Sequence, residues 1–396
     1  MLGKHTDYAG GRSLLCATDL GIAFVAQPRN DARVTIRDER SGELDAFEIS
    51  GDLETTTGDW TNYPRTVARR LCSNFGSLRG ADIVFESSLP LAAGMSSSSA
   101  LIVGFSTVLM RLNELESSSA YRSNISSVEE RAGYLGTVEN GQTFGSLEGA
   151  AGVGTFGGSE DHTAILCCSP GALKQYAFCP VVHERSVAFP DSLCFVIGSS
   201  GVIAEKTGAA LDLYNRASRL AGAAARVIGA EAGTEVPHLA AAVRGASGER
   251  RDEIRSLLGV SDAEGFTGQD FVDRYDQFVN ESETIIPAAT SALDNSDLER
   301  FGALICESQQ CGWQLLKNQV EETVWLADEA VRQGALAGSA FGAGFGGSVY
   351  ALVGADSVTS FVDRWRTGYV DRFPARSHAS DFLITRPGPA TFELSP

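Results

Sequence analysis

The sequence has no continuous apolar run of about 18 residues, the minimum that suggests a membrane-spanning helix. Its first residues also lack the basic stretch followed by an apolar stretch that marks a secretory signal. We therefore expect a cytoplasmic protein with no membrane partner.

Basic residues are scarce relative to acidic ones: Lys and Arg total 32, Asp and Glu total 50, and the net charge is −18. This excess of negative charge opposes binding to the phosphates of DNA or RNA, so we expect no nucleic-acid partner. An anionic ligand such as ATP would need a local pocket of backbone N–H groups and a metal ion.

The sequence also lacks C-x-x-C pairs and any metal-binding spacing among its eight cysteines. Cys167 and Cys168 are adjacent, so they cannot form an ordinary unstrained disulfide. A chain of 396 residues is long enough to bury about three quarters of its unfolded surface without such staples. Reduced thiols in the cytosol are the simpler expectation.

What the sequence does contain is a loop of small residues between a predicted strand and a predicted helix. Residues 81–86 include an apolar β-rich run, and apolar residues recur at helical spacing over 98–113. The loop between them is rich in serine and hinged at Gly94. We expect a serine side chain to cap the helix, and the remaining first-turn N–H groups to attract phosphate. The alternative is an ordinary capped helix, because no Gly-Lys-Ser/Thr follows to make a Walker A motif.

The start of the chain places His5, Asp7 and Tyr8 within four residues of one another, just before two glycines. Such polar groups could hydrogen-bond a polyhydroxylated ligand, although a frayed terminus is the alternative. The β-leaning stretch 13–27 and the alternation over 33–37 predict two paired strands joined by a turn at 28–31.

Later segments are predicted mainly as helices. We expect helices over 271–293, kinked at Pro287, and over 298–316, and we assign both to packing. Gly342, Gly344 and Gly347 satisfy the G-x-G-x-x-G expression. A dinucleotide site needs a strand before these glycines and a helix after them, but here the predicted helix precedes and a strand follows.

Several of these segments resemble the GHMP kinases, a superfamily of galactokinase, homoserine, mevalonate and phosphomevalonate kinases. Residues 4–11 resemble the sugar-binding signature of galactokinases, and residues 90–100 resemble the phosphate loop of the superfamily. Residues 59–63 look like another galactokinase segment, and residues 338–348 resemble the third glycine-rich motif. The resemblance extends over essentially the whole chain.

The resemblance implies an α+β fold of two lobes with the active site in the cleft between them. Residues 1–185 would form an ATP-binding lobe similar to ribosomal S5 domain 2, and residues 186–396 a helix-rich α+β lobe. The oligomeric state, monomer or dimer, stays open.

The implied reaction is ATP-dependent phosphorylation of a monosaccharide at its anomeric hydroxyl, with Asp161 as general base. Asp161 lies in the segment 157–162, and an apolar strand is expected directly after it, over 163–168. The implied sugar-binding residues are Lys4, His5, Asp7, Gly158 and Tyr214. The implied ATP-binding residues are Pro90, Ala93, Gly94, Met95, Ser96, Ser97, Ser98, Ser99 and Ala100. The third motif, with Gly342, Gly344, Gly346 and Gly347, would lie under the substrate and beside the phosphate loop.

The resemblance also implies a Mg²⁺ ion that accompanies ATP. Its expected ligands are Ser98 and Glu139, with Glu148 as the second choice for the carboxylate, because the glycine-rich loop 141–158 loosens the alignment.

Two departures from the family pattern leave alternatives open. Family members carry an arginine shortly before the His-Thr-Asp-Tyr segment, and this sequence starts after that position. Either a longer chain supplies the arginine, or the protein is a catalytically silent sugar- and ATP-binding regulator.

The second departure is Lys4, which stands where the family usually has a glutamate that contacts the terminal hydroxymethyl group of the sugar. A positive charge there would suit a carboxylate, so a sugar acid such as a uronate is one alternative substrate. In the other alternative Lys4 turns to solvent, and galactose or a relative is accepted.

Overall fold

The computed structural model describes residues 1–56, 58–90, 94–203 and 208–394, and the chain divides into two compact units. The two predicted lobes, residues 1–185 and 186–396, are consecutive stretches of the chain, and this division stays a prediction. The units are interleaved in sequence, and each is described by itself. Unit 1 contains Met1–Cys16, Ala92–Met95 and Ser169–Gly388, and unit 2 contains Ala17–Leu91, Ser96–Cys168 and Pro389–Pro396.

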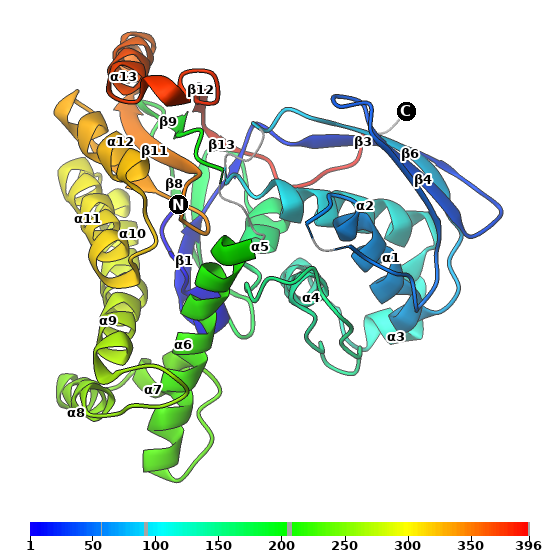
Figure 1. Ribbon diagram of the computed structural model, residues 1–396, viewed down its shortest axis with the longest axis horizontal. Coiled ribbons are helices and arrows are strands. Elements are labelled where there is room, and N and C mark those ends of the chain that lie inside the picture. Colours follow the sequence, from blue (N-terminus) through cyan, green and yellow to red (C-terminus); the bar gives the residue numbers. More distant parts are fainter. Residues whose placement is uncertain (57, 91–93, 204–207, 395–396) are drawn as a thin grey trace. The chain divides into compact units, whose positions relative to one another are not determined.

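Unit 2 is built on a four-stranded sheet in the order β3-β6-β4-β5, with helices α1 and α2 packed against each other and α2 against β3 (Figure 1). In β6, Ile83 and Phe85 are buried while Val84 between them is 40% exposed, as a half-buried strand requires. Its elements are β2 (Ala17–Thr18), β3 (Ile22–Pro28), β4 (Arg33–Asp38), β5 (Leu44–Glu48), α1 (Asn62–Phe75), β6 (Ala81–Ser87), α2 (Ser97–Leu112), the short 3₁₀ segment Leu115–Ser117, α3 (Ser119–Arg122), α4 (Val128–Asn140) and α5 (Glu160–Cys167).

The strand predicted over 81–86 and the helix predicted over 98–113 are confirmed by β6 and α2. The predicted pairing of the strands on either side of the turn at 28–31 is wrong. Strand β6 lies between β3 and β4, antiparallel to β3 and parallel to β4. Gly80 makes this insertion possible, because a Cβ at that position would collide with the carbonyl group of Arg33.

The strand predicted over 163–168 is also wrong, because residues 163–167 belong to helix α5 and Cys168 is its C-cap. The N–H of Thr163 donates to the carbonyl of Ser159 at 2.9 Å, which closes the first helical turn. Gly136 allows helix α4 to pack closely against the start of this helix, because a Cβ at position 136 would lie only 2.7 Å from Cβ of Ser159. A short apolar run suits a strand and a buried helix equally well, and here packing against α4 selects the helix.

Unit 1 contains two antiparallel sheets, β1-β7-β8 and β10-β11-β9-β12, and most of the helices. Its elements are the 3₁₀ segment Asp7–Ala9, β1 (Arg12–Leu15), β7 (Ala172–Ala177), β8 (Val182–Ala188), β9 (Leu193–Ser199), α6 (Gly208–Ala232), α7 (Leu239–Val243), α8 (Gly248–Gly259), α9 (Gly268–Phe278), the π-helical segment η3 (Val279–Ile285), α10 (Ile286–Asp294), α11 (Leu298–Cys311), the π-helical segment η4 (Gly312–Leu316), α12 (Glu321–Arg332), β10 (Ala337–Ala340), β11 (Ser348–Gly354), the 3₁₀ segments Ala355–Ser357 and Pro374–Arg376, α13 (Val358–Arg372), β12 (Asp381–Thr385) and β13 (Pro387–Gly388).

Strand β9 is buried along its whole length because helices cover both faces of its sheet (Figure 1). Phe195 and Ile197 join the cluster formed with α10 and α11, and Val196 between them joins the cluster formed with α12 and α13. A strand covered on both sides reads as a continuous apolar run, which is the pattern of Leu193–Ser199.

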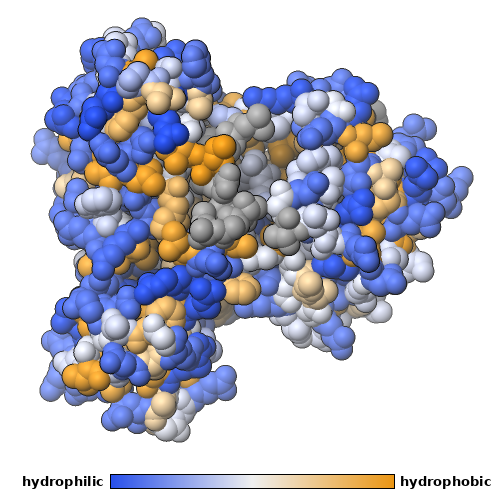
Figure 2. Space-filling model, in the orientation of Figure 1, coloured by the Kyte–Doolittle hydropathy of each residue, from blue (hydrophilic) through white to orange (hydrophobic). Residues whose placement is uncertain are grey.

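On the face shown in Figure 2, hydrophilic side chains predominate among the described residues, and the apolar ones form small separate areas. None of the helices in the described part of the chain is both long and apolar enough to span a membrane.

Candidate functional site

The N-terminal segment is buried in unit 1, so the alternative of a frayed terminus is wrong. Lys4, His5, Thr6 and Asp7 are each at most 8% exposed. Leu2 exchanges two backbone hydrogen bonds with Leu14, the next-to-last residue of β1. The segment that resembles a sugar-binding signature is therefore a fixed part of the unit.

Both ring nitrogens of His5 have partners within the protein. Nε2 lies 3.0 Å from the carbonyl oxygen of Ala343, and Nδ1 lies 2.8 Å from the hydroxyl of Tyr8. A carbonyl can only accept, so Nε2 donates and Nδ1 accepts from the tyrosine. Burial lowers the pKa of His5 to about 4, opposed in part by the Ala343 bond, so the ring is neutral near pH 7.

Three buried side chains on one helical face hold the backbone of this segment. Arg274 donates to the carbonyl of His5 at 2.5 Å, and Gln277 donates to the carbonyl of Lys4 at 2.9 Å. Glu281 accepts from the N–H of Gly3 at 2.8 Å. None of the three is predicted from the sequence, because the helix expected over 271–293 is assigned to packing. Their spacing of three and four residues, on a helix that is otherwise apolar on that side, was the available signal.

The side chain of Lys4 points into unit 1. It is 7% exposed, and its Nζ donates to Oγ of Ser308 and to Oγ of Ser339, each at 2.8 Å. The alternative in which Lys4 turns to solvent is therefore wrong.

Residues 341–347, which contain the glycines of the third motif and which we call the glycine loop, connect the antiparallel strands β10 and β11. A strand follows it, which agrees with the rejection of a dinucleotide site, although the strand β10 before it was not predicted. Gly342, Gly344, Gly346 and Gly347 all have positive φ. A Cβ at Gly342 would lie 3.0 Å from the carbonyl oxygen of Gly94, so this loop packs against the residues just before the serine run.

Unit 1 therefore brings three segments into contact, and each of them resembles a different signature of the family. His5 contacts the glycine loop through Ala343, and the loop contacts Gly94. Tyr214, on helix α6, adds its ring at 5.5 Å from the His5 ring. Met95 packs against the core of the same unit.

In unit 2, helix α2 begins at Ser97, and Ser96 is its N-cap residue. The expected serine cap is wrong: Ser96 has a φ of 54°, and its side chain makes no capping hydrogen bond. Pro90 precedes the loop, and Ser97, Ser98 and Ala100 lie in the first turn of α2. Ala93 lies outside the described residues.

Glu139, near the end of helix α4, is a buried carboxylate beside the first turn of α2. It is 6% exposed, and its Oε2 accepts from Oγ of Ser99 at 3.0 Å. The same oxygen lies 3.2 Å from Nε2 of His162, whose side chain is 2% exposed. His162 comes from the first turn of α5, next to Asp161. These contacts join the first turns of α2 and α5 through Glu139.

The residues at this point fit a Mg²⁺ ion that arrives with a nucleotide. Mg²⁺ in such sites takes one or two carboxylates, and phosphate oxygens and water complete its ligands. Glu139 offers a hard oxygen beside a serine-rich helix start, whereas Glu148 lies exposed on the loop after α4. Among the described residues, no group of three or more His, Cys, Asp or Glu side chains is placed to hold a metal by itself.

Asp161 is half-buried in the first turn of α5, and Gly158 lies just before that helix. The loop before them is tied to the end of α4, because the side chain of Asn140 donates to the carbonyl of Gly157 at 2.8 Å. The predicted role of Asp161 stays a prediction.

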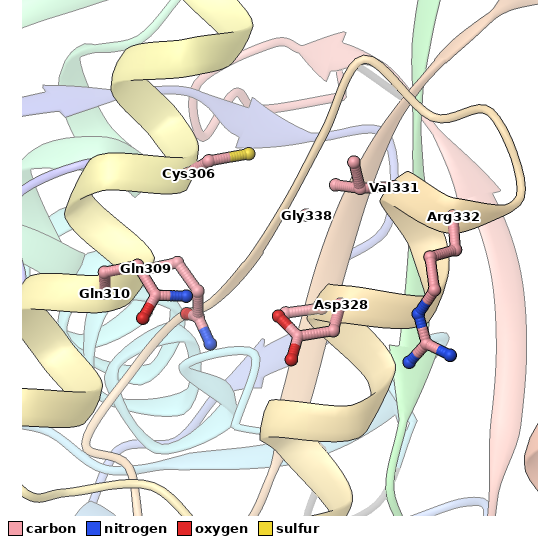
Figure 3. A pocket seen from close by; sticks show the side chains of 8 residues that line it. Cys306, Gln309, Gln310, Asp328, Val331, Arg332 and Gly338 are labelled. Carbon is pink, nitrogen blue, oxygen red and sulfur yellow. The ribbon is translucent and has the colours of Figure 1, made fainter.

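A separate pocket of about 340 Å³ lies among α11, α12 and β10 (Figure 3). Gln309, Asp328 and Arg332 are among its lining residues. None of the predicted site residues lines it. Gln309 connects it to the surroundings of Lys4, because its Oε1 accepts from the N–H of Ala340 at 2.9 Å, next to Ser339.

Two segments of the chain match known family models, and the chain is similar to known proteins over most of its length. Residues 62–137 match the family model for the GHMP kinases N terminal domain, and residues 289–371 match the GHMP kinases C terminal model. Similar curated proteins include the galactokinase of Chloroflexus aurantiacus, 29% identical over 94% of this chain and 86% of the relative. The galactokinase of Chloroflexus aggregans is 26% identical over the same shares.

Solved structures agree on the fold. The galactokinase of Lactococcus lactis, solved with galactose, has a TM-score of 0.78 at 21% identity and covers 99% of this chain and 92% of its own. The mevalonate kinase of Methanococcus jannaschii has a TM-score of 0.55 at 12% identity, with 98% and 94% covered. The predicted GHMP kinase fold of mixed α and β content is confirmed. The chain therefore carries GHMP kinase N-terminal and C-terminal domains, the matches indicate an ATP-dependent sugar kinase, and the chain is galactokinase-like in sequence and in fold.

Proposed function

We propose that this protein transfers the γ-phosphate of ATP to the anomeric hydroxyl of a monosaccharide, with Asp161 as general base. Galactose or a related neutral hexose is the favoured substrate, because the similar curated proteins are galactokinases and one solved relative holds galactose. The observation that carries the proposal is the set of contacts from Ser99 through Glu139 to His162, which joins the helix of Asp161 to the serine-rich helix start.

In the proposed reaction, the first-turn N–H groups of α2 bind the phosphates, helped by the positive end of the helix dipole. Glu139 and Ser98 would hold Mg²⁺, which supplies charge neutralisation on the phosphates when bound. The anomeric oxygen forms a bond to the γ-phosphorus as the bond to the β–γ bridging oxygen breaks, and ADP leaves. Asp161 accepts the proton of the attacking hydroxyl.

His5 has a positioning role in this proposal. Its two ring nitrogens are bonded to Tyr8 and Ala343, so it orients the N-terminal segment against the glycine loop. Asp7 and Tyr214 would contact the sugar hydroxyls directly.

The test is phosphate transfer by wild type and by Asp161→Asn, followed by ADP release and by phosphorus NMR of the product. We expect the substitution to lower kcat by about 10²- to 10⁴-fold, since that is the usual contribution of a general base. Binding of ATP should be retained, and Glu160→Gln, in the same helical turn, is the matched control.

Two outcomes would decide against the proposal. An Asp161→Asn enzyme with undiminished turnover would remove the general-base role. A wild-type protein that binds ATP and sugar tightly but transfers no phosphate would instead support the silent-regulator alternative.

A further inference from the structure

We propose that Lys4 is a positioning residue that, together with Glu281, fixes the backbone of Gly3–His5, and that it does not bind the substrate. The inference rests on the proposed function, because this segment is the one proposed to hold the sugar. The residues that carry it all belong to unit 1, and we call Lys4, Glu281, Ser308 and Ser339 the Lys4 cluster.

The ammonium group of Lys4 is directed to two hydroxyls from different elements. Ser308 lies on α11 and Ser339 on β10; both are 0% exposed, and each accepts from Nζ at 2.8 Å. The absence of a side chain at Gly312 leaves room for the lysine, because a Cβ there would lie 3.1 Å from Lys4 Cδ. A buried ammonium needs such partners, since its desolvation is costly.

Glu281 supplies the opposite charge, and one hydroxyl connects the two. Oγ of Ser308 donates to Oε1 of Glu281 at 2.9 Å while it accepts from Lys4, so its single proton is accounted for. Glu281 is 0% exposed. If either charged group is removed, the other remains buried without its partner, which is strongly destabilising.

The Lys4 cluster acts directly on the proposed sugar segment. The same Oε1 of Glu281 accepts from the N–H of Gly3, and Gln277 and Arg274 hold the next two carbonyls along the segment. His5 in turn contacts the glycine loop, because its Nε2 donates to the carbonyl of Ala343. Displacing Lys4 should therefore shift the groups that meet the sugar, although Lys4 itself does not touch it.

The cluster also bears on the class of substrate. A sugar carboxylate that approached the ammonium would add a second negative charge near Glu281, at a place where two buried serine hydroxyls already accept from Nζ. We therefore infer that the substrate carries an uncharged terminal group, so a uronate is disfavoured.

The experiment compares the full-length wild type with Lys4→Met, Glu281→Gln and the double variant. We expect Lys4→Met to raise the KM for galactose by about tenfold while the KM for ATP changes less than about twofold. The double variant should recover part of the loss, because it leaves no unpaired charge. The matched control is Arg226→Gln with Glu264→Gln, an exposed ion pair of the same unit with a 2.7 Å contact, which should change neither constant.

A second readout does not depend on turnover. Hydrogen exchange of a peptide spanning residues 1–11 should be faster in Lys4→Met than in wild type and should slow again in the double variant. If wild type phosphorylates no sugar, the proposed function fails, and this exchange measurement still decides about the cluster.

Two results would overturn the inference. In one, Lys4→Met leaves both the galactose KM and the exchange unchanged. In the other, wild type prefers galacturonate to galactose and Lys4→Met abolishes only that preference, which would make Lys4 a direct ligand of a carboxylate.

Discussion

At the scale of single residues, His5 shows how burial decides protonation. Its folded pKa of about 4 lies below the ordinary value of 6.5, so the unfolded chain binds a proton at a higher pH than the folded one. Between these two values the unfolded state carries more protons, and the free energy of unfolding rises with pH. The stabilisation is fully present above about pH 6.5 and declines as the pH falls toward 4.

We therefore predict that His5→Gln flattens this part of the stability profile. Wild type should lose up to about 3 kcal/mol more than the variant between pH 6.5 and 4, since one pKa unit corresponds to about 1.4 kcal/mol. Denaturant unfolding at a series of pH values measures the difference. His378→Gln, at an exposed position, is the control, and parallel profiles for wild type and His5→Gln would contradict the prediction.

Glu139 and Glu148 offer a second comparison between single residues. We predict that Glu139→Gln lowers turnover by about 10- to 100-fold and raises the Mg²⁺ concentration needed for half-maximal activity, because the metal loses a charged ligand. Glu148→Gln should be close to wild type, since Glu148 is exposed on the loop. A Mg²⁺ titration of both variants makes the measurement, and a defect confined to Glu148→Gln would exchange the two roles.

Single residues also mark the limit of what the sequence could predict. The motif residues His5, Gly94 and Gly342 were identifiable because each belongs to a short local pattern. Arg274 and Glu281 carry only a weak signal, their spacing on a largely apolar helical face, because their function depends on contact with residues that lie far away in the sequence. A charged residue in an amphipathic helix is usually on its solvated face, and only the fold reveals that these two are buried.

At the scale of elements, we predict that the glycines of the loop between β10 and β11 are needed for two reasons: their positive φ angles and the absence of a Cβ where other backbone atoms lie close. Gly344 has a φ of +84°, and a Cβ there would collide with the carbonyl oxygen of Asn318. Gly334 has a φ of +99°, and a Cβ at that position would meet no atom within 4 Å. A substitution at Gly334 therefore tests backbone strain alone, whereas a substitution at Gly344 tests backbone strain together with steric overlap.

We predict that Gly334→Ala costs about 1 kcal/mol of stability, as a left-handed alanine does, and that Gly344→Ala costs about 1–3 kcal/mol more. Gly344→Ala should also weaken ATP binding, because the loop packs against Gly94 of the proposed phosphate loop. Thermal unfolding and ATP titration of both variants check this. Equal melting temperatures would show that the loop can move away from Asn318.

The predictability of elements followed the strength of their local pattern. Helix α2 and strand β6 were predicted nearly to the residue, because long periodic runs identify themselves. The sequence predicts a strand over 163–168 in place of helix α5, because a helix of eight residues contains too few turns to show its period. The order of strands could not be read at all, since the insertion of β6 between β3 and β4 depends on contacts that the hairpin rule does not describe.

At the scale of the whole molecule, the net charge of −18 is predicted to make stability depend on salt. Self-repulsion destabilises a compact chain of one charge sign, and the screening length falls from about 30 Å at 0.01 M salt to about 8 Å at 0.15 M. The melting temperature should therefore rise by roughly a few degrees over this range of NaCl, as measured by calorimetry.

Choline chloride at the same ionic strength is the control for specific sodium binding and should give the same rise. A melting temperature that falls with salt would mean that the surface ion pairs, such as Arg226 with Glu264, outweigh the overall repulsion.

The interleaving of the two units has a consequence for synthesis on the ribosome. Strand β1 emerges early, but its partner β7 is translated only after most of unit 2. Unit 2 in turn is complete only once residues 389–394 have been translated. In this segment Thr391 donates to the carbonyl of Ile165, and Glu393 pairs with Arg111. Neither unit can reach its full set of contacts until residues up to about 393 have left the ribosome, and until then apolar strands such as β9 need protection by chaperones.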